Sequence, residues 1–124
     1  MPGPKPFKIS IPVKPISWNV LARKNHWLYT KVFDEWKRAT WAAVEEGRLR
    51  GIRFKGPVVI SVECHWVQHR RHDVDSVVAK PVIDALVDMR VIPDDSLEFV
   101  REVRYSGQVG AGKDEMTVTV YPIC

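Results

Sequence analysis

The sequence predicts a small α/β or α+β domain with a mixed β-sheet, and three observations support this prediction. The chain has 124 residues, enough for one hydrophobic core and too few for two domains. Its residues are 45% hydrophobic and include five Trp, which excludes disorder as the main state. Segments with the two-residue period of strands alternate with segments of helical spacing, in the order β-α-β-α-β-β. We therefore expect a single domain over residues 1–124.

The first half is predicted to contain a strand, a loop and a helix. Residues 7–13 alternate apolar and polar side chains as a half-buried strand does, and Pro12 makes it an edge strand or marks its end. Residues 15–27 have no clean period and are expected to form a long loop. From Tyr29 to Glu46 the apolar residues follow helical spacing, and Gly47 is a natural stop.

The second half is predicted to add a strand, a helix and two more strands. Residues 58–67 alternate most clearly, and residues 76–90 are expected to form a helix that Asp75 caps. Pro81 lacks an N–H and crowds the carbonyl four residues earlier, so a bulged, tight or broken first turn is expected between Asp75 and Pro81, with regular helix from about Pro81 to Met89. Strands are expected near 99–105 and 116–121, with a loop over 107–113 between them.

Charge divides the chain unevenly around its net value of +4. Residues 1–56 carry twelve Lys and Arg against four Asp and Glu, whereas residues 57–124 carry seven against eleven. This division suits an enzyme that holds metal ions against DNA, although charge alone favours an ordinary solvated surface.

Two further features indicate where the protein acts. Cys64 and Cys124 form no disulfide framework, and both are expected to be reduced thiols. No stretch is apolar enough to span a membrane, and the first residues lack the apolar core of a secretory signal. The expected location is therefore cytoplasmic.

Paired carboxylates next to basic residues mark the most informative segment, residues 69–97. Asp73 and Asp75 stand one residue apart directly after a basic run, and Asp94 and Asp95 follow beyond a helix-like segment. Carboxylate oxygens ligate Mg²⁺, Mg²⁺ bridges to phosphate oxygens, and basic side chains hold the rest of a polyanion. The pattern therefore indicates a metal-dependent nuclease.

Read together, the stretches ECHWVQHRRHDVDS, AKPVIDAL and IPDDSLEFV resemble the RusA family of crossover-junction endodeoxyribonucleases. The resemblance is specific between Glu63 and Phe99 and looser around Pro15 to Asn19. It implies a homodimer that resolves four-way (Holliday) junctions in branched DNA. It also implies Mg²⁺ as the cofactor, with Mn²⁺ able to replace it.

Carried over by position, Asp73, Asp75 and Asp95 match the family's catalytic, metal-binding aspartates, and Asp94 matches a neighbour of the third. Lys80 matches the lysine that the family places near the scissile phosphate. Ser76 stands where the family usually has Asn, and the segment from Asp75 to Asp84 is one residue longer than usual. Counting forward from Asp73 gives Ala79 as the lysine position and counting back from Asp84 gives Lys80, which we favour because a helix absorbs one residue as a bulge. The candidate DNA-binding residues are basic or aromatic: Arg70, Arg71, His69, His72, Arg23, Lys24 and Trp27.

Plainer interpretations remain for each motif. The aspartates could cap a helix or shape a turn, and Asp84 and Asp88 are expected to form a solvated face or a row of salt bridges. A zinc site of Cys64, His65, His69 and His72 fits poorly, because adjacent strand residues point to opposite faces. Trp18 and Trp27 could stack on unpaired bases or simply pack the loop down. The alternative functions are a nuclease for flaps or forks and a non-catalytic DNA-binding protein.

Overall fold

The computed structural model describes residues 6–18, 26–69, 72, 74 and 77–123, and within them it confirms the predicted fold class. The elements follow one another as β1 (Phe7–Ile11), α2 (His26–Glu46), β2 (Val58–Trp66), α3 (Lys80–Asp88), β3 (Val100–Val109) and β4 (Glu115–Pro122). This is the predicted order β-α-β-α-β-β.

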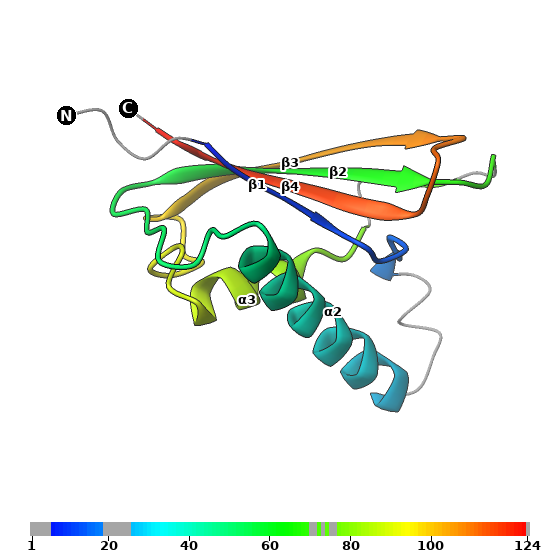
Figure 1. Cartoon of the computed structure of the whole chain (residues 1–124), viewed down its shortest axis with the longest axis horizontal. Coiled ribbons are helices and arrows are strands. Elements are labelled where there is room, and N and C mark those ends of the chain that lie inside the picture. Colours follow the sequence, from blue (N-terminus) through cyan, green and yellow to red (C-terminus); the bar gives the residue numbers. More distant parts are fainter. Residues whose placement is uncertain (1–5, 19–25, 70–71, 73, 75–76, 124) are drawn as a thin grey trace.

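The strands form one mixed sheet in the spatial order β1-β4-β2-β3. β4 pairs antiparallel with both β1 and β2, whereas β2 and β3 are parallel and α3 makes the crossover between them. β1 lies at one edge, as Pro12 predicted, and β3 lies at the other. Both helices cover the same face of the sheet, and the opposite face carries no helix of the described chain (Figure 1).

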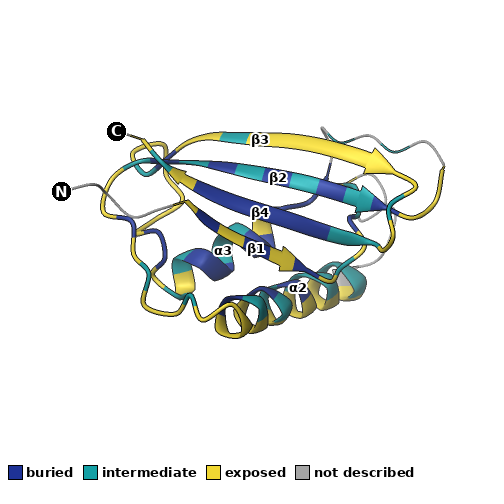
Figure 2. Cartoon of the chain, turned by 45° about the horizontal axis from the view of Figure 1, so that its top comes forward, coloured by how far each residue is buried: buried dark blue, intermediate teal, exposed yellow. Residues whose placement is uncertain are grey.

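The core lies between the sheet and the two helices. In β2 the alternate residues from Val58 to Trp66 are buried and those between them are half-buried, as the period-two pattern predicts (Figure 2). On α2, Trp36, Thr40 and Val44 are buried one helical turn apart, and the Thr40 hydroxyl donates a 2.7 Å hydrogen bond to the Trp36 carbonyl. Trp36 and Trp66 are both buried in this core, with exposures of 5% and 4%.

Both helices end in the same hydrogen-bonded turn, in which an arginine takes the left-handed backbone conformation. After α2, Arg48 has a φ of 56°, and the N–H of Leu49 donates to the Val44 carbonyl at 3.0 Å. After α3, Arg90 has a φ of 60°, and the N–H of Val91 donates to the Leu86 carbonyl at 2.9 Å. These are Schellman turns, which usually place glycine at the left-handed position. Gly47 was expected to stop α2, but the residue that adopts the left-handed conformation is Arg48.

The second helix begins close to Pro81. It starts at Lys80 and ends at Asp88, which confirms the regular helix expected from about Pro81 to Met89. Its N-cap residue is Ala79 and it has no side-chain cap, so a helix beginning at Ser76 with a cap from Asp75 is wrong. Upstream, the backbone of Val77 forms an isolated antiparallel β-bridge with Ser17, so Val77 is not part of the helix. The predicted irregularity before Pro81 is thus confirmed in the described residues.

The end of β3 also differs from the prediction. The strand runs to Val109, through residues 107–109 that were expected to belong to a loop. Gly107 lies within this extension of the strand, and its missing side chain leaves room for Trp66 and Val74 on one side. Of the described helices, neither is long and apolar enough to cross a membrane.

Candidate active site

A pocket of about 200 Å³ opens where the start of α3 meets the turn before β3 and the chain after β1. Its walls combine charged and aromatic groups from four segments that are distant in sequence. Tyr105 reaches the pocket because it pairs with Val62 and so shares the helix-covered face of the sheet. The pocket is lined by Trp18, Ala79, Lys80, Ile83, Asp84, Asp95, Val100, Val103 and Tyr105.

Lys80 lies between two carboxylates at this pocket. Its Nζ is 3.3 Å from Asp84 Oδ1 and 3.8 Å from Asp95 Oδ2. The two predicted site residues Lys80 and Asp95 are therefore neighbours, although fifteen positions separate them in the sequence. Ala79, the other candidate for the lysine position, is 2% exposed and carries no charge to offer.

Asp84 and Asp88 behave as the predicted salt-bridge row. Asp84 pairs with Lys80 one helical turn earlier, and Asp88 Oδ2 lies 2.8 Å from Lys37 Nζ on α2. The hydrogen bond and charge of Asp88 raise the pKa of Lys37 above its ordinary value. Asp84 differs from Asp88 because it also lines the pocket.

Trp66, at the end of β2, contacts two loops that are far apart in the sequence. Its indole Nε1–H donates a 3.1 Å hydrogen bond to the Pro15 carbonyl, and its ring stacks on His72 with centroids 4.1 Å apart and planes 3° from parallel. Farther along, the N–H of Val78 donates to the Ile16 carbonyl at 2.9 Å. The segment from Pro15 to Trp18 thus lies beside the chain that leads into α3.

Gly107 allows this arrangement to be close-packed. A Cβ added at Gly107 would lie 2.8 Å from Val74 Cγ1 and 2.9 Å from Trp66 Cζ3, closer than side chains tolerate. Val74 stands between Asp73 and Asp75, which lie outside the described residues together with Ser76. The described neighbours on either side are nevertheless held in place, by Trp66 and by the bridge at Val77.

The other predicted DNA-binding residues fall in three places. Arg70, Arg71, Arg23 and Lys24 lie outside the described residues. His69 is exposed and its ring lies against Gly110, where an added Cβ would be 2.6 Å from His69 Cε1. The His72 ring packs on Trp66, and its buried Nε2 has no hydrogen-bond partner among the residues described.

The aromatic residues of the N-terminal loop separate in space. Trp27 is 66% exposed on the first turn of α2, where Lys31 Nζ lies 5.2 Å from its ring centroid, and it does not line the pocket. Trp18 is 38% exposed and does line it, with Tyr29 and Phe33 packed behind its ring. Trp18 and Tyr105 are therefore the aromatic residues that line the pocket with Lys80, and the sequence offered only the loop composition as a signal for Trp18.

The carboxylate oxygens of the site suit a hard cation such as Mg²⁺. Asp95 offers carboxylate oxygens on a side chain that is 48% exposed, next to Lys80. No cluster of three or more metal-binding side chains occurs within the described residues. Burial raises the pKa of the Cys64 thiol to about 12, so in the absence of a metal it is protonated at neutral pH.

Comparison with known proteins adds no relative. The chain matches none of the models of known protein families and none of the curated protein sequences with which it was compared.

Proposed function

We propose that this chain is an Mg²⁺-dependent, structure-specific DNA endonuclease that resolves four-way (Holliday) junctions. The observation that supports this most directly is the position of Lys80 Nζ, 3.8 Å from Asp95 Oδ2 at the rim of a pocket with aromatic walls. A cation and a hard-metal ligand side by side suit an anionic phosphodiester, and exposed aromatic rings suit the bases next to it. The likeness of residues 63–99 to RusA nucleases points the same way.

In this proposal the residues of the chain have separate tasks. Lys80 contacts a non-bridging oxygen of the scissile phosphate, and Asp84 holds the lysine side chain along the helix while the site is empty of DNA. Trp18 and Tyr105 flank the neighbouring nucleotide. Asp73, Asp75 and Asp95 hold Mg²⁺. Bound Mg²⁺ supplies charge neutralisation at the phosphate and a more acidic water as nucleophile.

The proposed assembly is a homodimer acting in the cytoplasm. A junction is symmetric, and its resolution requires nicks in two strands, which a two-fold dimer with two sites delivers. The edge strand β3 supports this idea, because its residues after Val100 are exposed or half-exposed along almost their whole length (Figure 2). Unpaired edge strands of ten residues are surfaces that a second copy can extend.

The proposal is tested by cleavage of four substrates of matched sequence: a four-way junction, a flap, a fork and a linear duplex. We expect Mg²⁺ or Mn²⁺ to support cleavage of the junction, Ca²⁺ to support binding with little cleavage, and chelator to abolish cleavage. Asp75→Asn serves as the matched control, since it should keep DNA binding and lose cleavage.

Each alternative has its own outcome in this assay. Equal or better cleavage of flaps or forks would assign a broader branched-DNA nuclease. Tight DNA binding without cleavage under any metal would assign a non-catalytic DNA-binding protein, with the Lys80 ion pairs serving only the fold. Full cleavage in excess chelator would overturn the metal-dependent mechanism.

A further inference from the structure

Arginines occupy both left-handed positions that close the two helices. Residues with a Cβ rarely adopt a positive φ, and glycine is the usual choice there. Arg48 and Arg90, at φ values of 56° and 60°, both depart from this preference. Glycine would suit the backbone better at both positions, so the local conformation does not explain either arginine. Departures of this kind concentrate at functional sites.

One of the two arginines borders a groove that lies away from the candidate active site. The groove is open, with a volume of about 580 Å³, and lies between the ends of α2 and α3. Arg53 Nη1 donates a 3.2 Å hydrogen bond to the Arg90 carbonyl, which ties the loop after α2 to the end of α3. We call this surface the arginine groove; its lining residues include Trp41, Arg50, Arg53, Met89 and Arg90.

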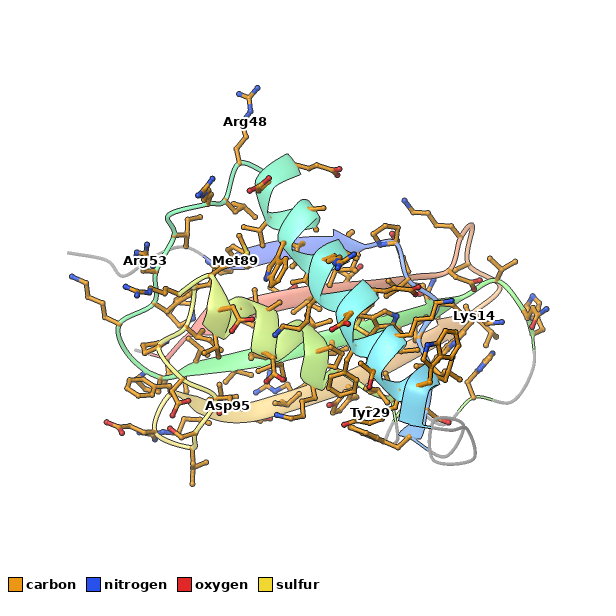
Figure 3. The ribbon with its side chains drawn as sticks, turned by 90° about the horizontal axis from the view of Figure 1, so that it is seen from below. Lys14, Tyr29, Arg48, Arg53, Met89 and Asp95 are labelled. Atoms are coloured by element: carbon orange, nitrogen blue, oxygen red, sulfur yellow. The ribbon has the colours of Figure 1, made fainter. Side chains whose placement is uncertain are left out.

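The carboxylates of the groove are already matched by cations. Asp88 Oδ2 lies 2.8 Å from Lys37 Nζ, and Glu45 Oε1 lies 3.7 Å from Arg50 Nη1. The positive charge that the groove offers to a ligand therefore comes from Arg53 and Arg90. Arg48 does not line the groove but adds a third exposed guanidinium on the turn after α2. Figure 3 shows Arg48 projecting outward from the turn after α2, and Arg53 near Met89 at the end of α3.

We propose that the arginine groove, together with Arg48, binds the phosphate backbone of a duplex DNA arm whose branch end lies at Lys80. The proposal rests on the function proposed above and adds a second contact surface to it. Guanidinium groups bind phosphate oxygens with two parallel hydrogen bonds and keep their charge at all relevant pH values. Because these groups come from two separate turns and do not converge on one point, they suit successive phosphates better than one small anion.

The helix α3 fixes the spacing between the two surfaces. The helix from Lys80 to Asp88 is about 12 Å long at 1.5 Å per residue, and Arg90 lies two residues beyond its end. A duplex rises 3.4 Å per base pair, so this length corresponds to roughly four base pairs. Arg53, Met89 and Asp95 all appear on the helix-bearing face in Figure 3. One DNA arm can therefore touch both ends of α3.

The simpler explanation is that the arginines stabilise the helix ends through the helix dipole. The two explanations differ in the melting temperature expected for the double variant Arg48→Gly with Arg90→Gly. If the arginines only stabilise the helix ends, the melting temperature falls. Glycine suits the left-handed backbone, so on our proposal the melting temperature stays the same or rises. DNA affinity falls roughly tenfold per lost contact.

The measurement is binding of a labelled four-way junction in Ca²⁺ over a series of salt concentrations, with melting temperatures in parallel. We expect the slope of log K against log salt to become shallower by about 1.8 in the double glycine variant, since each lost phosphate contact removes about 0.9. Replacing both arginines with lysine keeps the charge and should keep the slope. The control Lys8→Gln with Lys113→Gln removes two exposed charges elsewhere and should change neither slope nor melting temperature.

Three outcomes would overturn the proposal. The first is an unchanged slope in the double glycine variant, and the second is an equal loss of slope in the control. The third is a wild-type protein that binds no DNA at all, which also removes the proposed function. Binding that depends on the arginines in a protein that never cuts DNA would instead support the groove and sink the nuclease.

Discussion

The rings of Trp66 and His72 lie face to face, with centroids 4.1 Å apart and planes within 3° of parallel. Trp66 comes from the end of a core strand, and His72 immediately precedes the first aspartate of the acidic pair. This one aromatic contact therefore ties His72, the residue before the acidic pair, to the sheet. Trp66 also holds Pro15 through its indole N–H, so the same side chain positions the two loops that border the pocket.

Substitution at Gly107 should disturb this contact, with a large loss of cleavage and a moderate loss of stability. In Gly107→Ala the new Cβ meets Trp66 and Val74 at under 3 Å, so one of them must move. We expect a loss of cleavage on the order of 100-fold from the displaced site, with a stability cost of about 1–3 kcal/mol from overpacking. Gly112→Ala is the matched control, because its Cβ would meet nothing within 4 Å. Unchanged cleavage in Gly107→Ala would show that Val74 does not position the acidic pair.

Removing the Lys80 ammonium should reduce the chemical step and leave the fold intact. Lys80→Met keeps much of the side-chain length and loses the charge, so cleavage should fall by about 10²–10³-fold. The ion pairs of Lys80 are largely exposed and worth no more than about 1 kcal/mol, so the melting temperature should change little. Single-turnover cleavage and thermal unfolding measure the two effects. Lys113→Met, which removes an exposed lysine elsewhere, should cut normally; comparable losses in both variants would argue against a catalytic role for Lys80.

Mg²⁺ should distinguish the two carboxylates that Lys80 contacts. A ligand that binds only the folded state raises its melting temperature by mass action, so we expect Mg²⁺ to stabilise the wild type. Asp95→Asn should lose this increase, whereas Asp84→Asn should keep it, because Asp84 is assigned to the lysine and not to the metal. The opposite pattern would exchange the two roles. If both variants keep the Mg²⁺-dependent rise in melting temperature, Asp94 is the next ligand to test.

Stability at alkaline pH should depend on Cys64. Burial raises the pKa of its thiol from 9.0 to about 12 in the folded state. The folded state therefore holds the proton while the unfolded state releases it, so the stabilisation is complete below pH 9 and is lost as pH rises toward 12. We expect the free energy of unfolding to fall by about 1.4 kcal/mol per pH unit in that range. Denaturant unfolding of Cys64→Ala in parallel isolates the thiol, since this variant should lack that component of the slope.

A dimer formed through β3 should respond to the exchange of one charge pair. Glu102 and Arg104 lie on the same side of the strand, 2.7 Å apart, and their hydrogen bond lowers the pKa of Glu102. Antiparallel pairing of two copies centred on Val103 would place Glu102 opposite Arg104 of the second copy. Glu102→Arg should then give monomers, and adding Arg104→Glu should restore the dimer. Sedimentation analysis measures the change; a wild type that sediments as a monomer, or a single variant that stays dimeric, would exclude this interface.

The sequence by itself determined the order of the elements, the buried face of β2 and the edge position of β1, because these follow from local periodicity and from Pro12. It also gave the helical stop near Gly47 and the break before Pro81, since both depend on backbone preferences of a few adjacent residues. Its candidate nuclease residues Lys80 and Asp95 proved to be neighbours at 3.8 Å.

Only the tertiary structure decided which distant side chains meet. The bridge between Ser17 and Val77, the approach of Trp66 and Val74 to Gly107, and the entry of Tyr105 into the pocket all depend on sheet register and strand order. Local periodicity says which face of a strand is buried but not which strand lies beside it. The left-handed conformation of Arg48, one residue after the expected Gly47, is similarly decided where the chain must turn back onto the core.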